Sequence, residues 1–288
     1  MLDHLNPTHI MSIFHRICDF GGRLSGTKSE ADALAYVRHF LDALPGGDLR
    51  LHDVDYDGWS SSECWIDIKG CCHEVFALPR GGSLPSNGVS LQVIDAGRGT
   101  IEELDALGPA LAGKAVVVTH EFMFAADHVH RMKKIDCAER HGAAAFVISN
   151  PDPATGRVSG GIRGSLAGFG VSHATRMSLR QAADTDEHVH FHLDSKIEKT
   201  RTQTIDWCIA GSDPAFVEQE IIISAHLDGH ESSENAMDNA SGVAVALAIE
   251  RELSDLDAIP CTVRALIFSA EEFGLCGSET YVAALPPR

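Results

Sequence analysis

The sequence predicts an α/β fold, with a mixed, largely parallel sheet flanked by helices and a smaller β-rich segment inserted into it. Two observations support this prediction. From residue 216 onward, two apolar runs of strand length alternate with two segments of helix length. A strand–helix–strand order implies a right-handed crossover between parallel strands. Before that, residues 75–200 consist of short β-rich runs joined by Gly- and Pro-rich connections.

Composition restricts the kinds of partner and location. The chain of 288 residues carries a net charge of −18, and a nucleic acid is not expected as a partner because phosphate binding needs clustered Lys and Arg. No stretch reaches the roughly 18 apolar residues of a membrane span, and the N-terminal segment lacks the pattern of a signal peptide. The eight cysteines form no CxxC pair. We therefore expect reduced thiols and a cytoplasmic protein.

The first 70 residues predict two helices followed by strands, and we assign residues 1–70 to the N-terminal part of one domain. Residues 5–19 have a helical pattern that ends at a Gly-rich break. Thr27 and Glu30 have the spacing of a capping box, and apolar residues at helical intervals follow them until a Pro-Gly-Gly sequence. Residues 50–69 alternate loosely, as strands do.

Residues 75–200 are interpreted as a self-contained insert, because segments of different character flank them. Near the end of the insert His188, His190 and His192 alternate along a strand, so they face one side. A solvated sheet face is the favoured interpretation of this row, and metal binding is the alternative. Within the insert, strands are predicted at 89–96, 114–120 and 143–150, and helices at 126–141 and 172–184.

The remaining segment, 205–288, is predicted to be the core of the first domain. Its elements in order are a strand in VEQEIIISAHLD, a helix in NASGVAVALAIERELSDL, a strand in CTVRALIFSA and a helix in GLCGSETYVAAL. The continuous apolar stretch of the second strand is typical of a buried parallel strand.

Five ionisable side chains are expected at one edge of this sheet. His226 and Asp228 follow the first strand. Glu271 and Glu272 follow the second strand, and Asp238 precedes the helix between the strands. Ligands of open α/β sheets bind outside the carboxyl ends of the strands. Crowded carboxylates repel one another unless a cation or a raised pKa relieves them, so this set favours a divalent metal site.

The residue types suggest a division of roles. One carboxylate of the pair Glu271–Glu272 can bind metal while its neighbour acts as a general base toward water. Asp238 can bridge two metals, and Asp228 can accept the second N–H of the His226 imidazole and orient the ring. Each of these residues taken singly is more often just solvated. Their combination at adjacent strand ends supports the metal-site hypothesis.

Two stretches, AHLDGHESSENAMDNASGVAVALAIER and VRALIFSAEEFGLCGSETYV, together resemble the core of the M28 zinc metallopeptidases, the aminopeptidase and glutamate-carboxypeptidase-like group. The resemblance covers roughly residues 216–284 and implies a zinc-exopeptidase-like fold. RLSGTKSEADALAYVRHFLDAL resembles the family's opening helix. The motifs GKAVVV and KIDCAERHGAAAFVISN of the insert resemble the protease-associated (PA) domain that some members carry.

The resemblance implies a role for each of the five residues. His226 is then a ligand of one Zn²⁺ and Glu272 a ligand of the other, and Asp238 bridges the two ions. Glu271 is then the catalytic base, and Asp228 holds His226 in place. The implied reaction is hydrolysis of a peptide or small amide substrate, usually at a chain terminus.

The family completes its two-metal site with a further Asp and a distal His downstream of the Glu-Glu pair. Neither residue type occurs among the 16 residues that follow Glu272. We therefore expect a C-terminally incomplete member of the family. The alternatives are a decayed homologue and a site completed by self-association or by a partner chain. His230, four residues after His226, is a hypothetical substitute ligand.

Three functions are compatible with the sequence. The favoured one is a zinc-dependent exopeptidase of the aminopeptidase type. The alternative is a non-catalytic homologue that binds partners through the PA-like insert. A third possibility is an amidohydrolase that acts on a non-peptide amide with the same metal chemistry.

Overall fold

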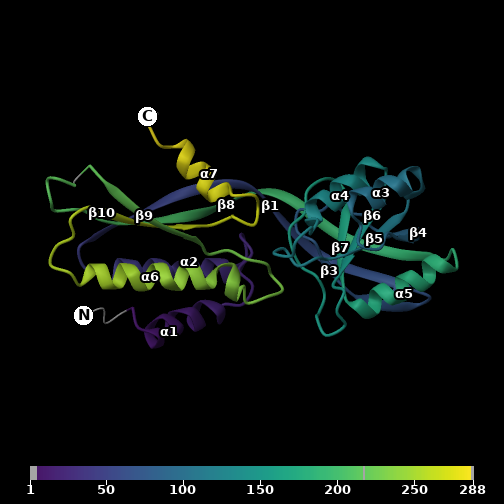
Figure 1. Ribbon diagram of the computed structural model, residues 1–288, viewed down its shortest axis with the longest axis horizontal. Helices are drawn as coiled ribbons and strands as arrows, with labels where there is room; N and C mark the ends of the chain where they lie inside the picture. Colours follow the sequence, from purple (N-terminus) through teal and green to yellow (C-terminus); the bar gives the residue numbers. More distant parts are fainter. Residues whose placement is uncertain (1–4, 217, 287–288) are drawn as a thin grey trace. The chain divides into compact units, whose positions relative to one another are not determined.

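A computed structural model describes residues 5–216 and 218–286. The chain forms two compact units, one made of Met1–Gly58 and Lys199–Arg288 and the other of Trp59–Glu198 (Figure 1). We call the first the discontinuous unit and the second the inserted unit. The inserted unit begins at Trp59, earlier than the boundary at 70–75 that the sequence predicted. The boundary falls inside a single long strand, so no loop marks it in the sequence.

That strand is β1 (Gly47–Ile68), and its counterpart near the end of the inserted unit is β8 (His188–Ile209). Each of the two passes from one unit into the other. The sequence predicted strands over residues 50–69 and around residues 188–192, but not that each continues from one unit into the other. Loose alternation marks extended structure but does not reveal whether a strand continues, because continuity depends on pairing with distant strands.

The sheet of the discontinuous unit is mixed, as predicted. β10 (Thr262–Phe268) pairs antiparallel with β8 and parallel with β9 (Glu220–His226). The parallel register aligns His226 with Phe268, the last residue of each strand. The carboxyl ends of β9 and β10 therefore lie side by side at one edge of the sheet.

Helices cover both faces of this sheet. Figure 1 shows α1 (Pro7–Cys18), α2 (Lys28–Asp42) and α6 (Ser241–Ser254) on one face and α7 (Cys276–Ala283) on the other. The core between the sheet and the three helices is an apolar cluster with members from every layer. Examples of fully or almost fully buried members are Ile17, Leu41, Trp207, Leu247 and Ile267.

The inserted unit has its own sheet and core. Four parallel strands run in the order β4 (Val89–Asp95), β5 (Ala115–Thr119), β6 (Ala145–Ser149) and β7 (Ala167–Val171). Short strands β2 (Cys71–Glu74) and β3 (Phe76–Ala77) pair antiparallel with β1 and β7.

Three helices and a short 3₁₀ turn complete the inserted unit. Apolar residues of α5 (His173–Asp184) pack into one core cluster, and those of α3 (Ile101–Leu107) and α4 (Arg131–Arg140) pack into another. The turn η1 (Gly108–Leu111) follows α3. α4 begins five residues later than predicted, at Arg131, with the His130 side chain accepting a hydrogen bond from Met132 N–H. Among the described residues, no helix is long and apolar enough to cross a membrane.

The row of histidines on β8 does not form the solvated face that the sequence favoured. Trp65 of β1 stacks on His190 and His192, with ring centroids 5.5 and 5.0 Å apart. His190 also contacts Ser90 Oγ through Nδ1 at 3.0 Å. The Trp65 ring covers His190 and His192, while His188 is exposed as predicted. Sequence alternation alone cannot show which side chain lies opposite.

Helix α6 carries a buried carboxylate, that of Glu250. Glu250 is 0% exposed, and neither of its carboxylate oxygens has a hydrogen-bond partner among the described residues. Burial raises the pKa of Glu250 to about 7. The folded state therefore binds a proton more tightly than the unfolded chain does, and ionisation of Glu250 opposes folding.

We predict that Glu250 makes the discontinuous unit less stable as the pH rises. Its stabilisation is complete below the unfolded pKa of 4.5 and is lost as the pH rises toward about 7. Glu250→Gln removes this dependence, so the free energy of unfolding of the wild type should fall by about 2 kcal/mol relative to the variant between pH 5 and 8. Urea unfolding of both proteins at the two pH values measures it. A difference that stays constant with pH would contradict the assignment.

Candidate metal centre

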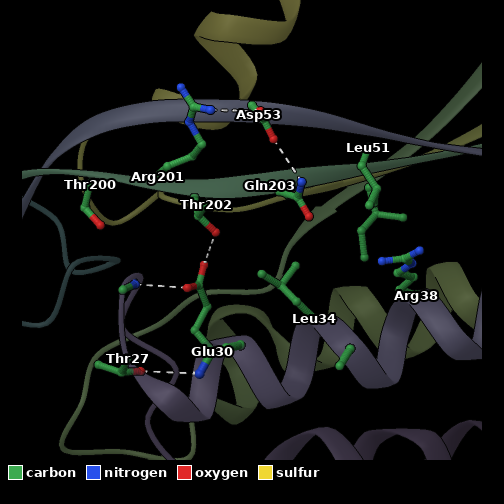
Figure 2. A pocket seen from close by; sticks show the side chains of 14 residues that line it. Thr27, Glu30, Leu34, Arg38, Leu51, Asp53, Thr200, Arg201, Thr202 and Gln203 are labelled. Carbon is green, nitrogen blue, oxygen red and sulfur yellow. Dashed lines mark hydrogen bonds and ion pairs between the residues drawn. The ribbon is translucent and has the colours of Figure 1, made fainter.

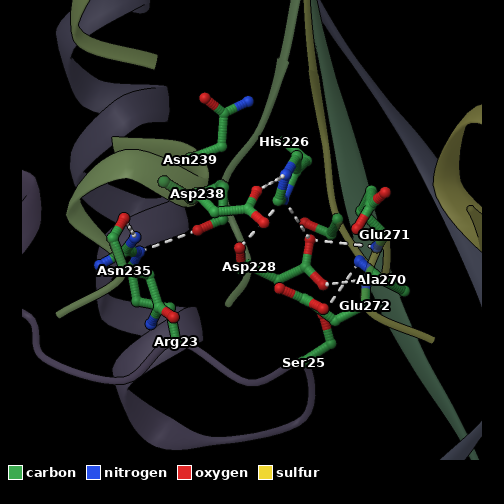
Figure 3. Close-up of polar contacts among 12 residues, drawn as sticks. Arg23, Ser25, His226, Asp228, Asn235, Asp238, Asn239, Ala270, Glu271 and Glu272 are labelled. Carbon is green, nitrogen blue, oxygen red and sulfur yellow. Dashed lines mark hydrogen bonds and ion pairs between the residues drawn. The ribbon is translucent and has the colours of Figure 1, made fainter. Parts of the chain in front are cut away.

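The predicted site residues meet at the carboxyl ends of β9 and β10 (Figure 3). His226 ends β9, and Asp228 lies two residues beyond it. Glu271 and Glu272 follow the end of β10. The five-residue turn η2 (Ala236–Ala240), which leads directly into α6, brings Asp238 to the same place. These five residues and His230 are called the strand-end cluster below.

Asp228 is the buried centre of the strand-end cluster. Its side chain is 0% exposed. Its two carboxylate oxygens accept hydrogen bonds from the backbone N–H groups of Glu271, at 3.1 Å, and Glu272, at 3.0 Å. Asp228 therefore fixes the backbone that carries both glutamates. Backbone donors satisfy a buried carboxylate as well as a cation does.

The predicted contact between Asp228 and His226 is made mainly by the backbone oxygen of Asp228, and not by its carboxylate. The Nδ1 atom of His226 is 3.1 Å from the backbone oxygen of Asp228 and 3.6 Å from its carboxylate Oδ1. The longer distance exceeds a hydrogen bond, so the backbone oxygen orients the ring. The carboxylate acts on the ring by its nearby charge.

His226 turns its other nitrogen toward Asp238, with Nε2 and Oδ1 2.9 Å apart. Burial acts to lower the pKa of His226, but Asp228 and Asp238 outweigh it and raise that pKa to about 10. The His226 contact in turn lowers the pKa of Asp238. The Asp238 side chain is 74% exposed, so this end of the cluster is open to solvent.

The other end of the strand-end cluster contains a second pair. His230 Nε2 lies 3.0 Å from Glu272 Oε2. The remaining polar atoms of this pair, Glu272 Oε1 and His230 Nδ1, are buried without a hydrogen-bond partner among the described residues. Burial raises the pKa of the neighbouring Glu271, with like-charged carboxylates adding to the effect and His226 opposing it.

The cluster has suitable donors for a metal ion, arranged as two imidazole–carboxylate pairs. Imidazole nitrogens and carboxylate oxygens are the usual zinc donors outside cysteine sites. The orphaned Glu272 Oε1 is a buried oxygen without a neutralising partner, which is the environment that a cation satisfies. The residues therefore fit a metal. As arranged, no three donor atoms of the cluster lie within 4.8 Å of one another, and the one such group among the described residues is elsewhere, in the inserted unit.

Arg23 is a structural residue of the site that the sequence analysis overlooked. It is 0% exposed and lies beside Asn235 at one side of the cluster (Figure 3). Its guanidinium donates to backbone carbonyl oxygens of the loop after β9 and of the segment that begins at the end of α1. A buried guanidinium with several carbonyl acceptors fixes the relative positions of the loops that supply them. The acceptors lie 2.8–3.3 Å away and belong to Ile17, Gly21, Leu227, Glu234 and Asn235.

The glycine beside Arg23 is needed for the same loop contact. A Cβ atom added to Gly22 would lie 2.1 Å from the backbone oxygen of Glu231. The Arg23 backbone oxygen also accepts a hydrogen bond from Gly229 N–H at 3.1 Å. The GGR sequence was interpreted as a simple break between helices. In the structure its backbone packs closely against the loop after β9. The only sequence feature that could have indicated this contact was an arginine directly after two glycines.

A second overlooked contact holds the turn before the glutamates. The Ser25 hydroxyl accepts a hydrogen bond from Ala270 N–H at 2.9 Å and donates to Glu30 at 3.0 Å. Ala270 has a positive φ of 55°, which L residues adopt reluctantly. Glu30 also accepts from Thr202 and from the backbone of Gly26. Glu30, which the sequence predicted to complete a capping box with Thr27, therefore turns its carboxylate toward the site.

A cavity of about 530 Å³ lies on the other side of Glu30, between α2 and strands β1 and β8 (Figure 2). Its charged lining is mostly engaged already: Arg201 Nη1 is 3.2 Å from Asp53, and Gln203 donates to the same carboxylate at 2.9 Å. None of the six residues of the strand-end cluster lines this cavity. The cavity and the candidate metal centre share only the Glu30 contact network.

Comparison with known proteins agrees with this geometry. Residues 207–288 match the sequence model of Peptidase family M28. Bovine carboxypeptidase Q is 26% identical over an alignment of 277 positions that covers 91% of this chain and 58% of the relative. A probable leucine aminopeptidase 2 of Aspergillus fumigatus is 28% identical over 158 residues, 53% of this chain and 31% of the relative. The chain therefore spans only a little more than half the length of carboxypeptidase Q, although most of the chain takes part in the match.

Two solved structures share the fold. A zinc aminopeptidase from Bacillus subtilis superposes with a TM-score of 0.76 at 21% identity, over 97% of this chain and 65% of the other. A peptidase M28 precursor from Shewanella amazonensis gives 0.78 at 21% identity, over 95% and 66%. The family resemblance and the fold class predicted from the sequence are confirmed: residues 207–288 are similar to peptidase family M28, and the fold is shared with these two structures. The PA-like character of the insert stays a prediction.

We predict that Arg23→Lys strongly destabilises the discontinuous unit. A lysine has three donors and no planar fork, so several buried carbonyl oxygens lose their partner. The expected loss in the free energy of unfolding is about 2–4 kcal/mol, measured by urea unfolding.

The matched control is Arg38→Lys, at an exposed position on α2. It should change the stability by less than about 0.5 kcal/mol. Equal effects of the two variants would show that Arg23 does not hold the loops.

Proposed function

We propose that this chain provides the metal-binding part of a zinc-dependent exopeptidase of the aminopeptidase type. The observation that carries the proposal is the strand-end cluster itself. Two imidazole–carboxylate pairs flank Glu271 at adjacent strand ends of an M28-family fold. Peptide bonds, or small amides of similar chemistry, are the proposed substrates.

Each residue has a proposed role in holding the metal. His226 and Glu272 would each hold one of two zinc ions, with Asp238 positioned between them. The arrangement into two separate pairs favours two ions over one. His230, in contact with Glu272, is an additional donor at the second position. When bound, zinc supplies Lewis-acid chemistry that polarises a carbonyl and acidifies water.

Glu271 is the proposed catalytic base. Its backbone N–H donates to the Asp228 carboxylate, while its own carboxylate is influenced by the charges of His226 and the neighbouring carboxylates rather than by a hydrogen bond to a described residue. Its neighbour Glu272 is engaged with His230, so Glu271 is the glutamate that remains free. Its carboxylate would take a proton from the attacking water and deliver it to the leaving amine nitrogen. Asp228 is a positioning residue that sets where this carboxylate points.

The catalytic role is tested by Glu271→Gln. The amide cannot accept the proton, so kcat for an aminoacyl-anilide should fall at least about 100-fold. Zinc content after dialysis should remain that of the wild type, because Glu271 is not a ligand. Glu272→Gln is the matched variant one residue away, and it should lower zinc content as well as activity.

Two outcomes would count against the proposal. Folded wild-type chain that takes up zinc but hydrolyses no substrate would contradict catalysis by this chain alone, a result expected of an incomplete member as well as of a non-catalytic homologue. Folded chain that takes up no zinc would contradict the metal centre altogether. Circular dichroism of each variant checks that the fold is retained.

A further inference from the structure

A second group of metal-binding side chains lies in the inserted unit. Asp105 is on α3, Cys137 is on α4, and His141 directly follows α4. Cys137 and His141 are four residues apart, and the His141 N–H still donates to the Cys137 carbonyl oxygen at 3.2 Å. Residues at this spacing lie on the same face of a helical turn. Both therefore face Asp105 on the neighbouring helix.

The three donor atoms are close to the arrangement that a tetrahedral ion needs. Asp105 Oδ1 is 3.3 Å from Cys137 Sγ and 2.8 Å from His141 Nε2. One donor atom from each residue falls within 4.8 Å of the other two. Zinc bonds of 2.0–2.3 Å in tetrahedral geometry separate neighbouring donor atoms by about 3.3–3.8 Å. The Asp105–Cys137 distance already fits this range, the Asp105–His141 distance has to lengthen by about 0.5 Å, and the Cys137–His141 distance lies within 4.8 Å.

From this geometry we propose that Asp105, Cys137 and His141 form a single-ion site for Zn²⁺ or a cation of similar softness. This site is distinct from the strand-end cluster and independent of the peptidase function. A thiolate, an imidazole and a carboxylate together favour zinc-type ions over Mg²⁺ and Ca²⁺, which prefer oxygen donors only.

The surroundings of the three residues suit a structural ion with one exchangeable position. Cys137 is completely buried, which places the sulfur on the protein side of the site. Asp105 is exposed and His141 is partly exposed, so water can occupy the fourth position. On binding, the Cys137 S–H bond breaks, the sulfur binds the cation, and the proton passes to solvent. The ion would then join α3 to α4, which share one apolar cluster.

Two features oppose a cation at this position. The contacts from His141 and Cys137 lower the pKa of Asp105, and the nearby positive charge of Arg140 lowers it further. Burial and the neighbouring Asp105 also raise the pKa of the Cys137 thiol to about 11, so the ion has to displace a firmly held proton. The two negative donors of the bound state offset the charge of Arg140. The competing interpretation is that Asp105 simply ties the two helices by hydrogen bonds to Cys137 and His141.

Cobalt spectroscopy of the whole chain distinguishes these interpretations. Co²⁺ bound to a thiolate produces a sulfur-to-cobalt charge-transfer band in the near ultraviolet. The strand-end cluster contains no cysteine, so Co²⁺ bound there cannot produce this band. We expect the band in the wild type, its loss in Cys137→Ser, and its retention in His226→Ala. Cys64→Ser is the matched control, since Cys64 belongs to the same unit and lies outside the group.

The more exposed ligands provide a test that does not depend on the buried position. Asp105→Asn and His141→Ala should each weaken Co²⁺ binding, followed by the same band, at least about tenfold. Circular dichroism verifies that these variants fold. A folded wild type that gives no band, or a band that survives Cys137→Ser, would overturn the proposal and leave a hydrogen-bonded tie between the helices. If Glu271→Gln abolishes hydrolysis but keeps the band, the result supports the catalytic role of Glu271 and shows that the site in the inserted unit is independent of it.

Discussion

The candidate metal centre depends on one buried carboxylate, that of Asp228. It accepts the backbone N–H groups of both Glu271 and Glu272, so it connects the end of β9 to the end of β10. A hydrogen bond to a charged group contributes about 1.5–3 kcal/mol. The position of the proposed base thus depends on a side chain that never needs to touch a substrate. The parallel register of the two strands provides the distance that this contact requires.

Arg23 provides the opposite charge near this carboxylate. Its guanidinium donates to two points of the loop after β9, the carbonyl of Leu227 next to Asp228 and the carbonyl of Glu234. Ser25, two residues further on, holds the turn before the glutamates through Ala270. The short segment between α1 and α2 therefore fixes the loop after β9 and the turn after β10. The residues that hold the cluster are distant from it in sequence, while those that would bind metal are near the strand ends.

Most of the discontinuous unit could be predicted from the sequence, because apolar periodicity and strand–helix–strand order are local signals. The convergence of His226, Asp238 and the two glutamates followed from the rule that parallel strands share one edge. The contacts of Arg23, Ser25 and Glu30 that hold the cluster could not be predicted from this rule. Arg23 looked like part of a flexible break, because its acceptors are backbone carbonyls that leave no pattern in the sequence. Glu30 looked like a helix cap, because the spacing that predicts a cap cannot show where the carboxylate turns.

The central claim is that the strand-end cluster, organised by Asp228, binds zinc. Calorimetric titration of Zn²⁺ into the Cys137→Ser chain tests it most directly, since that substitution removes the proposed site in the inserted unit. The structure predicts zinc binding in this variant and affinity at least about tenfold weaker when Asp228→Asn is added. Absence of binding in folded Cys137→Ser protein, or equal affinity with and without Asp228→Asn, would contradict it.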